Sequence, residues 1–260
     1  GVGTISGVHP GYREADFKEN PFRANLRAIG NELEKAKEIA NGGIIGFNFM
    51  TVMNHYEEYV KEAIAAGADF IVSGAGLPVN LAKYAAGTRA AILPIVSSAR
   101  ALKLIVKQWQ RADRLPEAVW VEGPLAGGHL GYPYGHLVDG TFDTLEDSLV
   151  DVVDYVRELE EKSGVKIPVI AGGGVRNHAD MERLMALGAS GVQVGTKFVA
   201  TEECDAAPAF KQAYLRSRKE DVQLIESPVG LAARAIRNSF LEKVEKQGRI
   251  PVQRCYRCMN

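Results

Sequence analysis

Short apolar segments alternate with longer amphipathic segments along most of the chain. The short segments are rich in β-branched residues and apolar almost without interruption, which is typical of parallel strands covered on both faces. They are Val2–Ser6, Ile44–Phe49, Phe70–Ser73, Ala91–Val96, Ala118–Glu122, Val169–Ala171 and Val192–Gly195. The amphipathic segments between them predict helices at Pro21–Ala40, Tyr56–Ala66, Val79–Ala86, Ser98–Arg111, Leu145–Glu161 and Asp180–Leu187.

The pattern is a repeated βα unit, and two of the units share a phrase. "AIAAGADFIVSGAG" (Ala63–Gly76) and "LMALGASGVQVGTKF" (Leu184–Phe198) each end a helix, turn through a glycine and enter a buried strand. Gly67 and Gly188 fit the position just after a helix, where a left-handed residue is needed. Repeated βα units predict a (β/α)8 TIM barrel, and an open doubly wound sheet is the alternative.

The expected barrel occupies residues 1–205, and a C-terminal helical segment occupies 206–260. Two further helices are predicted there, near Pro208–Ser217 and Gly230–Gln247. Only seven strands are visible, and the sequence starts at Gly1 without Met. We therefore expect the first barrel strand to be missing from this sequence and the polypeptide to continue at both ends.

Composition narrows the functional classes. The 260 residues carry 31 Lys and Arg against 32 Asp and Glu, so the formal net charge is -1. This balance argues against a nucleic-acid or membrane surface built on bulk charge. Three cysteines are too few for a secreted disulfide framework, which favours a reducing cytoplasm. We expect a cytoplasmic protein with a small-molecule partner and neither nucleic acid nor membrane.

Two glycine turns predict a phosphate site. "VIAGGGV" ends a strand with Gly172, Gly173 and Gly174 before a helix, and "VQVGT" ends the next strand with Gly195 and Thr196. Bare backbone N–H groups at such turns bind phosphate, and the loops after barrel strands seven and eight often do so. The alternative is that these glycines serve only turns or close packing.

The connection after Glu122 is the longest strand-to-helix connection in the chain, running to about Asp143. Connections of this length are usually functional. Gly127 and Gly128 let the backbone pass close to a flat ligand, and His129 follows them. A histidine there is suited to general base catalysis, whereas a packed or surface loop histidine is the alternative.

Other candidates have weaker support. His136 lies in the same connection, and Asn48 ends the strand in "IIGFNFM", where its amide would reach a ligand ring or cap a turn. Lys197 fits a solvated helix position better than a Schiff-base site. Cys255 and Cys258 form a CxxC pair without a second pair, so no metal site is expected.

Together these motifs resemble the nitronate monooxygenase family, formerly called 2-nitropropane dioxygenases, whose relatives include flavin-type enoyl-acyl-carrier-protein reductases and NADH:quinone reductases. The matching stretches are "GVGTIS", "GFNFM", "SGAGLP", "VEGPLAGGHLGYP", "PVIAGGGV", "GVQVGTKFVATEECDA" and "SPVGLAARAIRN". The resemblance implies a TIM barrel with FMN at its C-terminal mouth.

By this resemblance, His129 is the catalytic histidine. It places the FMN phosphate on Gly172, Gly173, Gly174, Gly195 and Thr196, and it places Glu122, Gly128 and Asn48 beside the ribityl chain or ring. The implied reaction is the oxidation of alkyl nitronates or nitroalkanes by O2. The alternatives are an NAD(P)H-dependent FMN reductase of quinones or enoyl thioesters, a phosphate-sugar barrel without flavin, and an inactive barrel. The sequence is compatible with a homodimer.

Overall fold

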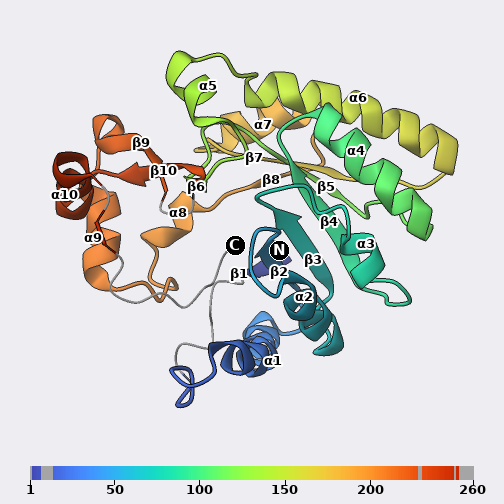
Figure 1. Cartoon of the computed structure of the whole chain (residues 1–260). Coiled ribbons are helices and arrows are strands. Elements are labelled where there is room, and N and C mark those ends of the chain that lie inside the picture. Colours follow the sequence, from blue (N-terminus) through green and yellow to red (C-terminus); the bar gives the residue numbers. More distant parts are fainter. Residues whose placement is uncertain (1, 7–13, 228–229, 249, 252–260) are drawn as a thin grey trace.

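Seven parallel strands form one curved sheet in the computed structural model, which describes residues 2–6, 14–227, 230–248 and 250–251. The order is β1-β2-β3-β4-β5-β7-β8, and every neighbouring pair is parallel (Figure 1). The bounds are β1 (Val2–Ser6), β2 (Ile44–Met50), β3 (Phe70–Gly74), β4 (Ala91–Val96), β5 (Val119–Glu122), β7 (Val169–Gly172) and β8 (Gly191–Gln193).

The strand order follows the chain order, and this distinguishes a barrel from a doubly wound sheet. A doubly wound sheet reverses its strand order at a switch point, whereas successive βα units of a barrel add strands in one direction. The fold is therefore a partial TIM barrel, as the sequence predicts, with β1 and β8 as its end strands among the described residues. The last strand begins and ends slightly earlier than predicted, at Gly191–Gln193.

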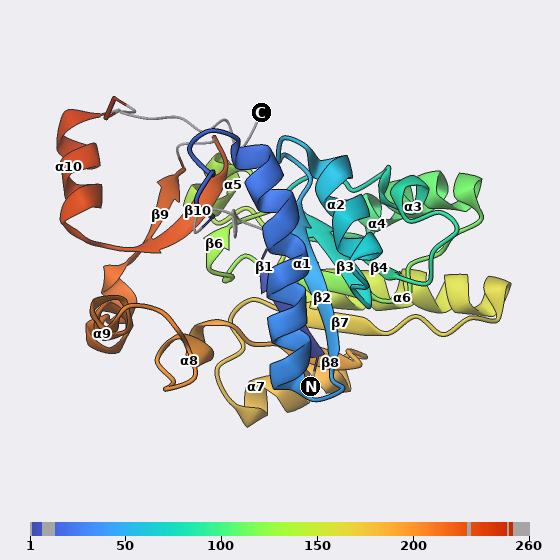
Figure 2. The ribbon, with the colours of Figure 1, turned by 90° about the horizontal axis from the view of Figure 1, so that it is seen from below.

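Helices cover the outer face of the sheet (Figures 1 and 2). They are α1 (Pro21–Ala40), α2 (Tyr56–Ala65), α3 (Leu81–Tyr84), α4 (Ala99–Trp109) with a 3-10 turn at Gln110–Ala112, α6 (Leu145–Ser163) and α7 (His178–Ala186). A short helix, α5 (Tyr134–Asp139), lies in the connection after β5. In the described part of the chain, no helix has the length and apolar character that crossing a bilayer requires.

Two apolar clusters fill the two faces of the sheet. The larger one joins the strands to the outer helices and includes Phe47, Ile71, Val119 and Leu149, all fully buried. The smaller one contains Phe70 and its neighbours inside the barrel: Val72, Leu93, Ala118, Ile95, Trp120 and Ile170. Because successive strand residues point to opposite faces, adjacent residues such as Phe70 and Ile71 enter different clusters. The filled interior leaves the carboxyl ends of the strands as the accessible mouth.

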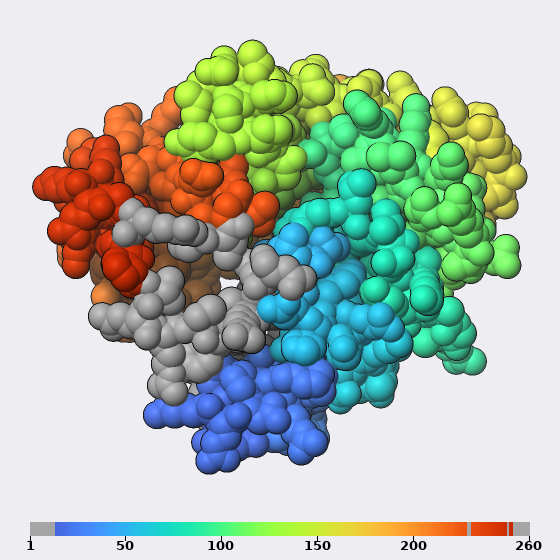
Figure 3. All heavy atoms as spheres, viewed as in Figure 1, coloured from blue at the N-terminus to red at the C-terminus, as the bar shows by residue number. Residues whose placement is uncertain are grey.

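The C-terminal segment combines helices with a small antiparallel sheet. It contains α8 (Thr196–Val199), α9 (Pro208–Arg216), a 3-10 turn at Lys219–Asp221, β9 (Val222–Glu226), β10 (Ala232–Ile236) and α10 (Ser239–Gln247). β10 is the central strand and pairs with β9 and with β6 (Gly128–His129). In the space-filling view this segment, orange to red, lies against the yellow-green part of the chain that carries α5 (Figure 3).

The predicted helix over Gly230–Gln247 is therefore wrong in its first half. Residues 232–236 are good helix formers by composition, but they form β10 and bury Ala232 and Ala233 against the loop that carries β6. The helix begins only at Ser239, where Asn238 caps it by accepting a hydrogen bond from the N–H of Leu241 at 3.0 Å. Non-local pairing overrides the local helix preference here.

Candidate functional site

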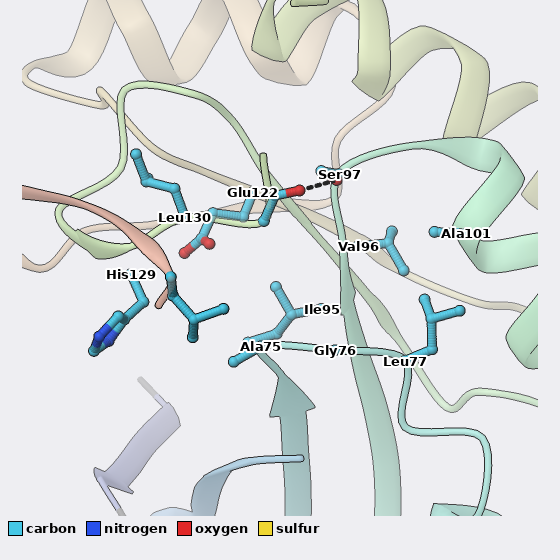
Figure 4. Close-up of a pocket in the computed structure, with 12 residues that line it drawn as sticks. Ala75, Gly76, Leu77, Ile95, Val96, Ser97, Ala101, Glu122, His129 and Leu130 are labelled. Carbon is cyan, nitrogen blue, oxygen red and sulfur yellow. Dashed lines mark hydrogen bonds between the residues drawn. The ribbon is translucent and has the colours of Figure 1, made fainter. Parts of the chain in front are cut away.

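A pocket of about 150 Å³ opens at the carboxyl ends of β3, β4 and β5 (Figure 4). Its lining is mostly apolar and comes from these three strand ends, from the segments that follow them and from the C-terminal segment. The lining residues are Ala75, Gly76, Leu77, Ile95, Val96, Ser97, Ala101, Glu122, His129, Leu130, Gly131 and Leu231. In Figure 4 the Glu122 carboxylate and His129 lie at the left of the view, and Leu77 and Ala101 lie at the right. The pocket thus has a polar end and an apolar end.

His129 reaches the pocket because the chain after β5 folds back over the mouth. The N–H of Gly123 donates to the carbonyl oxygen of Gly172 at 2.9 Å, which joins this turn to β7. Gly128 then adopts a φ of 72°, a conformation that favours glycine, and His129 pairs with Ala233 of β10. Glu122 and His129, which the family resemblance assigns to one site, both line this pocket. His136 lies on α5, is exposed and is outside the pocket lining.

Glu122 is half-buried at the last position of β5, and burial raises the pKa of its carboxyl group to about 7. In the described part of the chain, its carboxylate has no hydrogen-bond or ion-pair partner. The hydroxyl of Tyr132 donates to the backbone carbonyl of Glu122 at 3.2 Å rather than to the carboxylate. An ionised carboxylate without a partner is unfavourable in such a setting, so the neutral acid is populated near neutral pH.

Ser97 and Leu231 are among the pocket residues that were not singled out from the sequence. Ser97 follows β4 directly, and its hydroxyl donates to the carbonyl of Gly131 at 3.2 Å, which fixes the His129 loop against β4. Its place after a strand was a signal that sequence reasoning could have used. Leu231 comes from the C-terminal segment, about 100 residues after His129, and no local pattern places it here.

The β7 turn packs tightly against the β5 turn. Gly173 and Gly174 have φ values of 101° and 91°, which side chains rarely adopt. A Cβ at Gly173 would lie 3.0 Å from the carbonyl oxygen and 3.1 Å from the nitrogen of Gly123. A Cβ at Gly172 would lie 2.7 Å from the side-chain oxygen of Gln193. Close backbone packing and a positive φ therefore require glycine at position 173, whatever ligand the turn binds, whereas at position 172 a Cβ would press on the side chain of Gln193.

The β8 turn is open by comparison. Gly195 is the residue before α8, and a Cβ built there would meet no atom within 4 Å. Thr196, the first residue of α8, is exposed, as is Lys197. The first N–H groups of a helix lack partners within the helix. This turn, at the end of the strand beside β7, presents free backbone donors next to unfilled space.

The N-terminus of α7 is already capped by side chains. Asn177 accepts a hydrogen bond from the N–H of Asp180 at 2.9 Å, and the Asp180 carboxylate accepts from the N–H of Arg176 at 2.9 Å. The hydrogen bonds from Arg176 and from the guanidinium of Arg183 hold the pKa of the Asp180 carboxyl group below its usual value. A phosphate near these strands would thus bind at the turns and at α8 rather than on the α7 N-terminus.

Asn48 is half-buried in β2, in register with Ser6 of β1 and Val72 of β3, and is outside the pocket lining. Cys255 and Cys258 lie outside the described residues, and so do Pro228 and Val229 in the "SPVGLAARAIRN" stretch. The site residues that the structure brings together around one pocket are Glu122 and His129.

Comparison with known proteins places this arrangement in context. A family model described as nitronate monooxygenase matches residues 15–258. A probable nitronate monooxygenase of Staphylococcus haemolyticus is 34% identical over 136 residues, which is 52% of this chain and 36% of that protein. One of Bacillus subtilis is 30% identical over 134 residues, with the same coverage of both chains. These alignments thus span about a third of the length of the relatives.

Solved structures show the same fold. FabK from Thermotoga maritima aligns with a TM-score of 0.65 and 27% identity, over 84% of this chain and 63% of that chain. A nitroalkane oxidase from Streptomyces ansochromogenes aligns with a TM-score of 0.64 and 19% identity, over 93% of this chain and 71% of that chain. At that identity the second likeness supports the fold alone.

Proposed function

We propose that this chain, which belongs to the nitronate monooxygenase family, forms the catalytic mouth of an FMN-dependent enzyme that oxidises alkyl nitronates or nitroalkanes with O2. The observation that carries the proposal is the meeting of Glu122 and His129 in one pocket at the carboxyl ends of the strands. In TIM-barrel enzymes this end of the barrel carries the active site.

The residues present fit a flavin mononucleotide. At Gly195, Gly127 and Gly128, a built Cβ meets nothing within 4 Å, so backbone is exposed to free space in the β8 turn and in the His129 loop. Trp120, on the interior face of β5, has a buried indole N–H without a partner among the described residues. Open backbone and an unused donor at the mouth are compatible with a bound group that carries phosphate and several acceptors.

The proposed contacts follow from these positions. The turns at Gly172, Gly173 and Gly174 and at Gly195 and Thr196 would hold the phosphate. Glu122, Gly128 and Asn48 would border the ribityl chain or the ring. When bound, FMN supplies the redox chemistry of the reaction with O2.

His129 would take the proton from the α-carbon of a neutral nitroalkane. With a preformed nitronate, it would interact with the negative charge of that substrate. General base catalysis needs a group within hydrogen-bond reach of that proton, and a small substrate in the pocket would lie beside the imidazole. The apolar end at Leu77, Val96 and Ala101 would take the alkyl group and exclude water from it.

A second candidate is the NAD(P)H-dependent reduction of a quinone or an enoyl thioester. The 27% identity to FabK over most of this chain favours it. Both candidates use the same flavin and the same mouth. They differ in the electron donor, which is the substrate in the first reaction and NAD(P)H in the second.

The test begins with the flavin. The purified protein should release FMN on denaturation, and it should consume O2 with a primary alkyl nitronate and without NAD(P)H. Anaerobic bleaching of the flavin by NAD(P)H, with no O2 uptake on nitronate, would support the second candidate. A colourless protein that binds no added FMN would contradict both.

A further inference from the structure

Glu122 and His129 are the titratable side chains of the pocket, and they sit at the same end of it. The opposite end is formed by Leu77, Val96 and Ala101 (Figure 4). A cavity of about 150 Å³ is the size that admits a benzene molecule. The pocket therefore suits a compact ligand with a polar head and a short apolar tail.

The groups that face Glu122 leave its charge uncompensated. From its own loop come His129 and Tyr132, and the Tyr132 hydroxyl is directed to the backbone carbonyl of Glu122. On β10, the guanidinium of Arg234 donates to the carbonyl of Pro124, two residues after Glu122, rather than to the carboxylate. The segments after β3 and β4 contribute Ser97 and apolar residues to the pocket. On β7, the residue in register with Glu122 is Gly172, which has no side chain. Among the described residues, none forms an ion pair with Glu122.

We propose that Glu122 determines the charge that the pocket accepts: as the neutral acid it donates a hydrogen bond to an oxygen of an anionic substrate head, and as the carboxylate it repels that head. The inference rests on the proposed function in taking the head to be a nitronate-like anion. It assigns to the Glu122 side chain a role toward substrate, which is separate from a contact with the cofactor.

The physical basis is a single proton. A neutral carboxylic acid has one O–H donor, and a hydrogen bond from it to an anionic oxygen is among the stronger ones. Loss of that proton replaces the bond by repulsion between like charges inside a half-buried pocket. Because burial raises the pKa of Glu122 to about 7, the change falls in the neutral range.

The test uses an unreactive matched pair of probes, butanoate and butanamide, with the full chain in its flavin-loaded form and calorimetry as the readout. Butanoate is ionised throughout the range, whereas butanamide is neutral. The dissociation constant of butanoate should rise about tenfold between about pH 6 and about pH 8, as the protonated fraction of Glu122 falls. That of butanamide should stay constant.

Two variants identify the titrating group. Glu122→Gln keeps a donor at this position, so butanoate should bind with little pH dependence. His129→Gln should keep the pH dependence of the unmodified protein. Dependence that persists in Glu122→Gln and vanishes in His129→Gln would overturn the proposal in favour of His129. Absence of butanoate binding at both pH values would also overturn it.

The readout separates this inference from the proposed function. Nitronate oxidation that continues while butanoate binding shows no dependence on Glu122 would reject the inference and leave the function standing. Binding that behaves as expected in a protein that does not oxidise nitronates would reject the function and leave the role of Glu122 standing.

Discussion

The guanidinium of Arg234 donates a hydrogen bond to the carbonyl oxygen of Pro124, although 110 residues separate them in sequence. Arg234 lies on β10, in register with Gly128 of β6, and is half-buried. Through this bond and the β6–β10 pairing, the C-terminal segment holds the loop that carries His129 over the barrel mouth. The segment after the barrel is therefore part of the site.

Replacing Arg234 by Met should remove this bond while keeping most of the side-chain volume. Hydrogen bonds to charged groups contribute about 1.5–3 kcal/mol, so the free energy of unfolding should fall by that order. Urea denaturation measures it. Arg237→Met is the matched control, because Arg237 pairs with Glu242 at an exposed position and its loss should cost less than about 1 kcal/mol. An equal loss of unfolding free energy in both variants would contradict a stabilising role of the hydrogen bond between Arg234 and Pro124.

Replacing His129 by Ala should leave FMN bound and lower turnover of a neutral nitroalkane by about 100- to 10,000-fold, the usual contribution of a general base. Turnover of the preformed nitronate should fall less, since its proton is already gone. Steady-state O2 uptake with both substrates measures the difference. His136→Ala, from the same connection but exposed and outside the pocket, should retain normal rates. An unchanged rate for the neutral substrate in His129→Ala would remove His129 from the mechanism.

The two glycine turns call for different variants. A Cβ at position 195 would meet no atom within 4 Å, and the φ there is negative, so Gly195→Val should change the thermal midpoint little. Its side chain would block the approach of phosphate to the backbone, so the variant should bind FMN at least tenfold more weakly. Gly173→Val should lose both FMN and stability, because its Cβ would press on the backbone of Gly123 at a φ of 101°. Fluorescence titration with FMN and thermal unfolding separate the two effects. Normal FMN affinity in Gly195→Val would exclude the β8 turn from the phosphate site.

The sequence predicted the barrel well because its signals are local. Each strand from Ile44 to Gln193 is an apolar run next to an amphipathic helix, and each pair buries its own face. The same logic, applied to the turns after the strands, predicted a site at one edge of the sheet with His129 in it, whereas the family resemblance alone added Glu122 to that site. Strand ends meet at one edge of a parallel sheet, so the positions follow from the fold.

The errors have non-local causes. Residues 232–236 look helical in isolation and become a strand because β6 and β9 flank them. Leu231 directly precedes this strand and reaches the pocket through the same pairing, so its place in the pocket could not be predicted without the strand. The tight contact of Gly173 with Gly123 depends on two turns that lie about 50 residues apart in sequence. A glycine motif alone does not reveal whether a ligand or another backbone occupies the space beside it.

The raised pKa of Glu122 also makes stability depend on pH. Burial takes this pKa from 4.5 to about 7, so between these values the folded state binds more protons than the unfolded state. The free energy of unfolding of the unmodified protein should therefore lose the Glu122 contribution as pH rises through this window. Glu122→Gln has no carboxyl group to titrate at this position. Relative to the unmodified protein, its free energy of unfolding should therefore rise between about pH 5 and about pH 8, by roughly 3 kcal/mol at most.

Urea denaturation of both proteins at the two pH values measures this gain. Glu203→Gln is the control, since Glu203 is exposed and its replacement should leave the pH dependence unchanged. A difference between Glu122→Gln and the unmodified protein that is the same at both pH values would show that folding does not raise the pKa of Glu122.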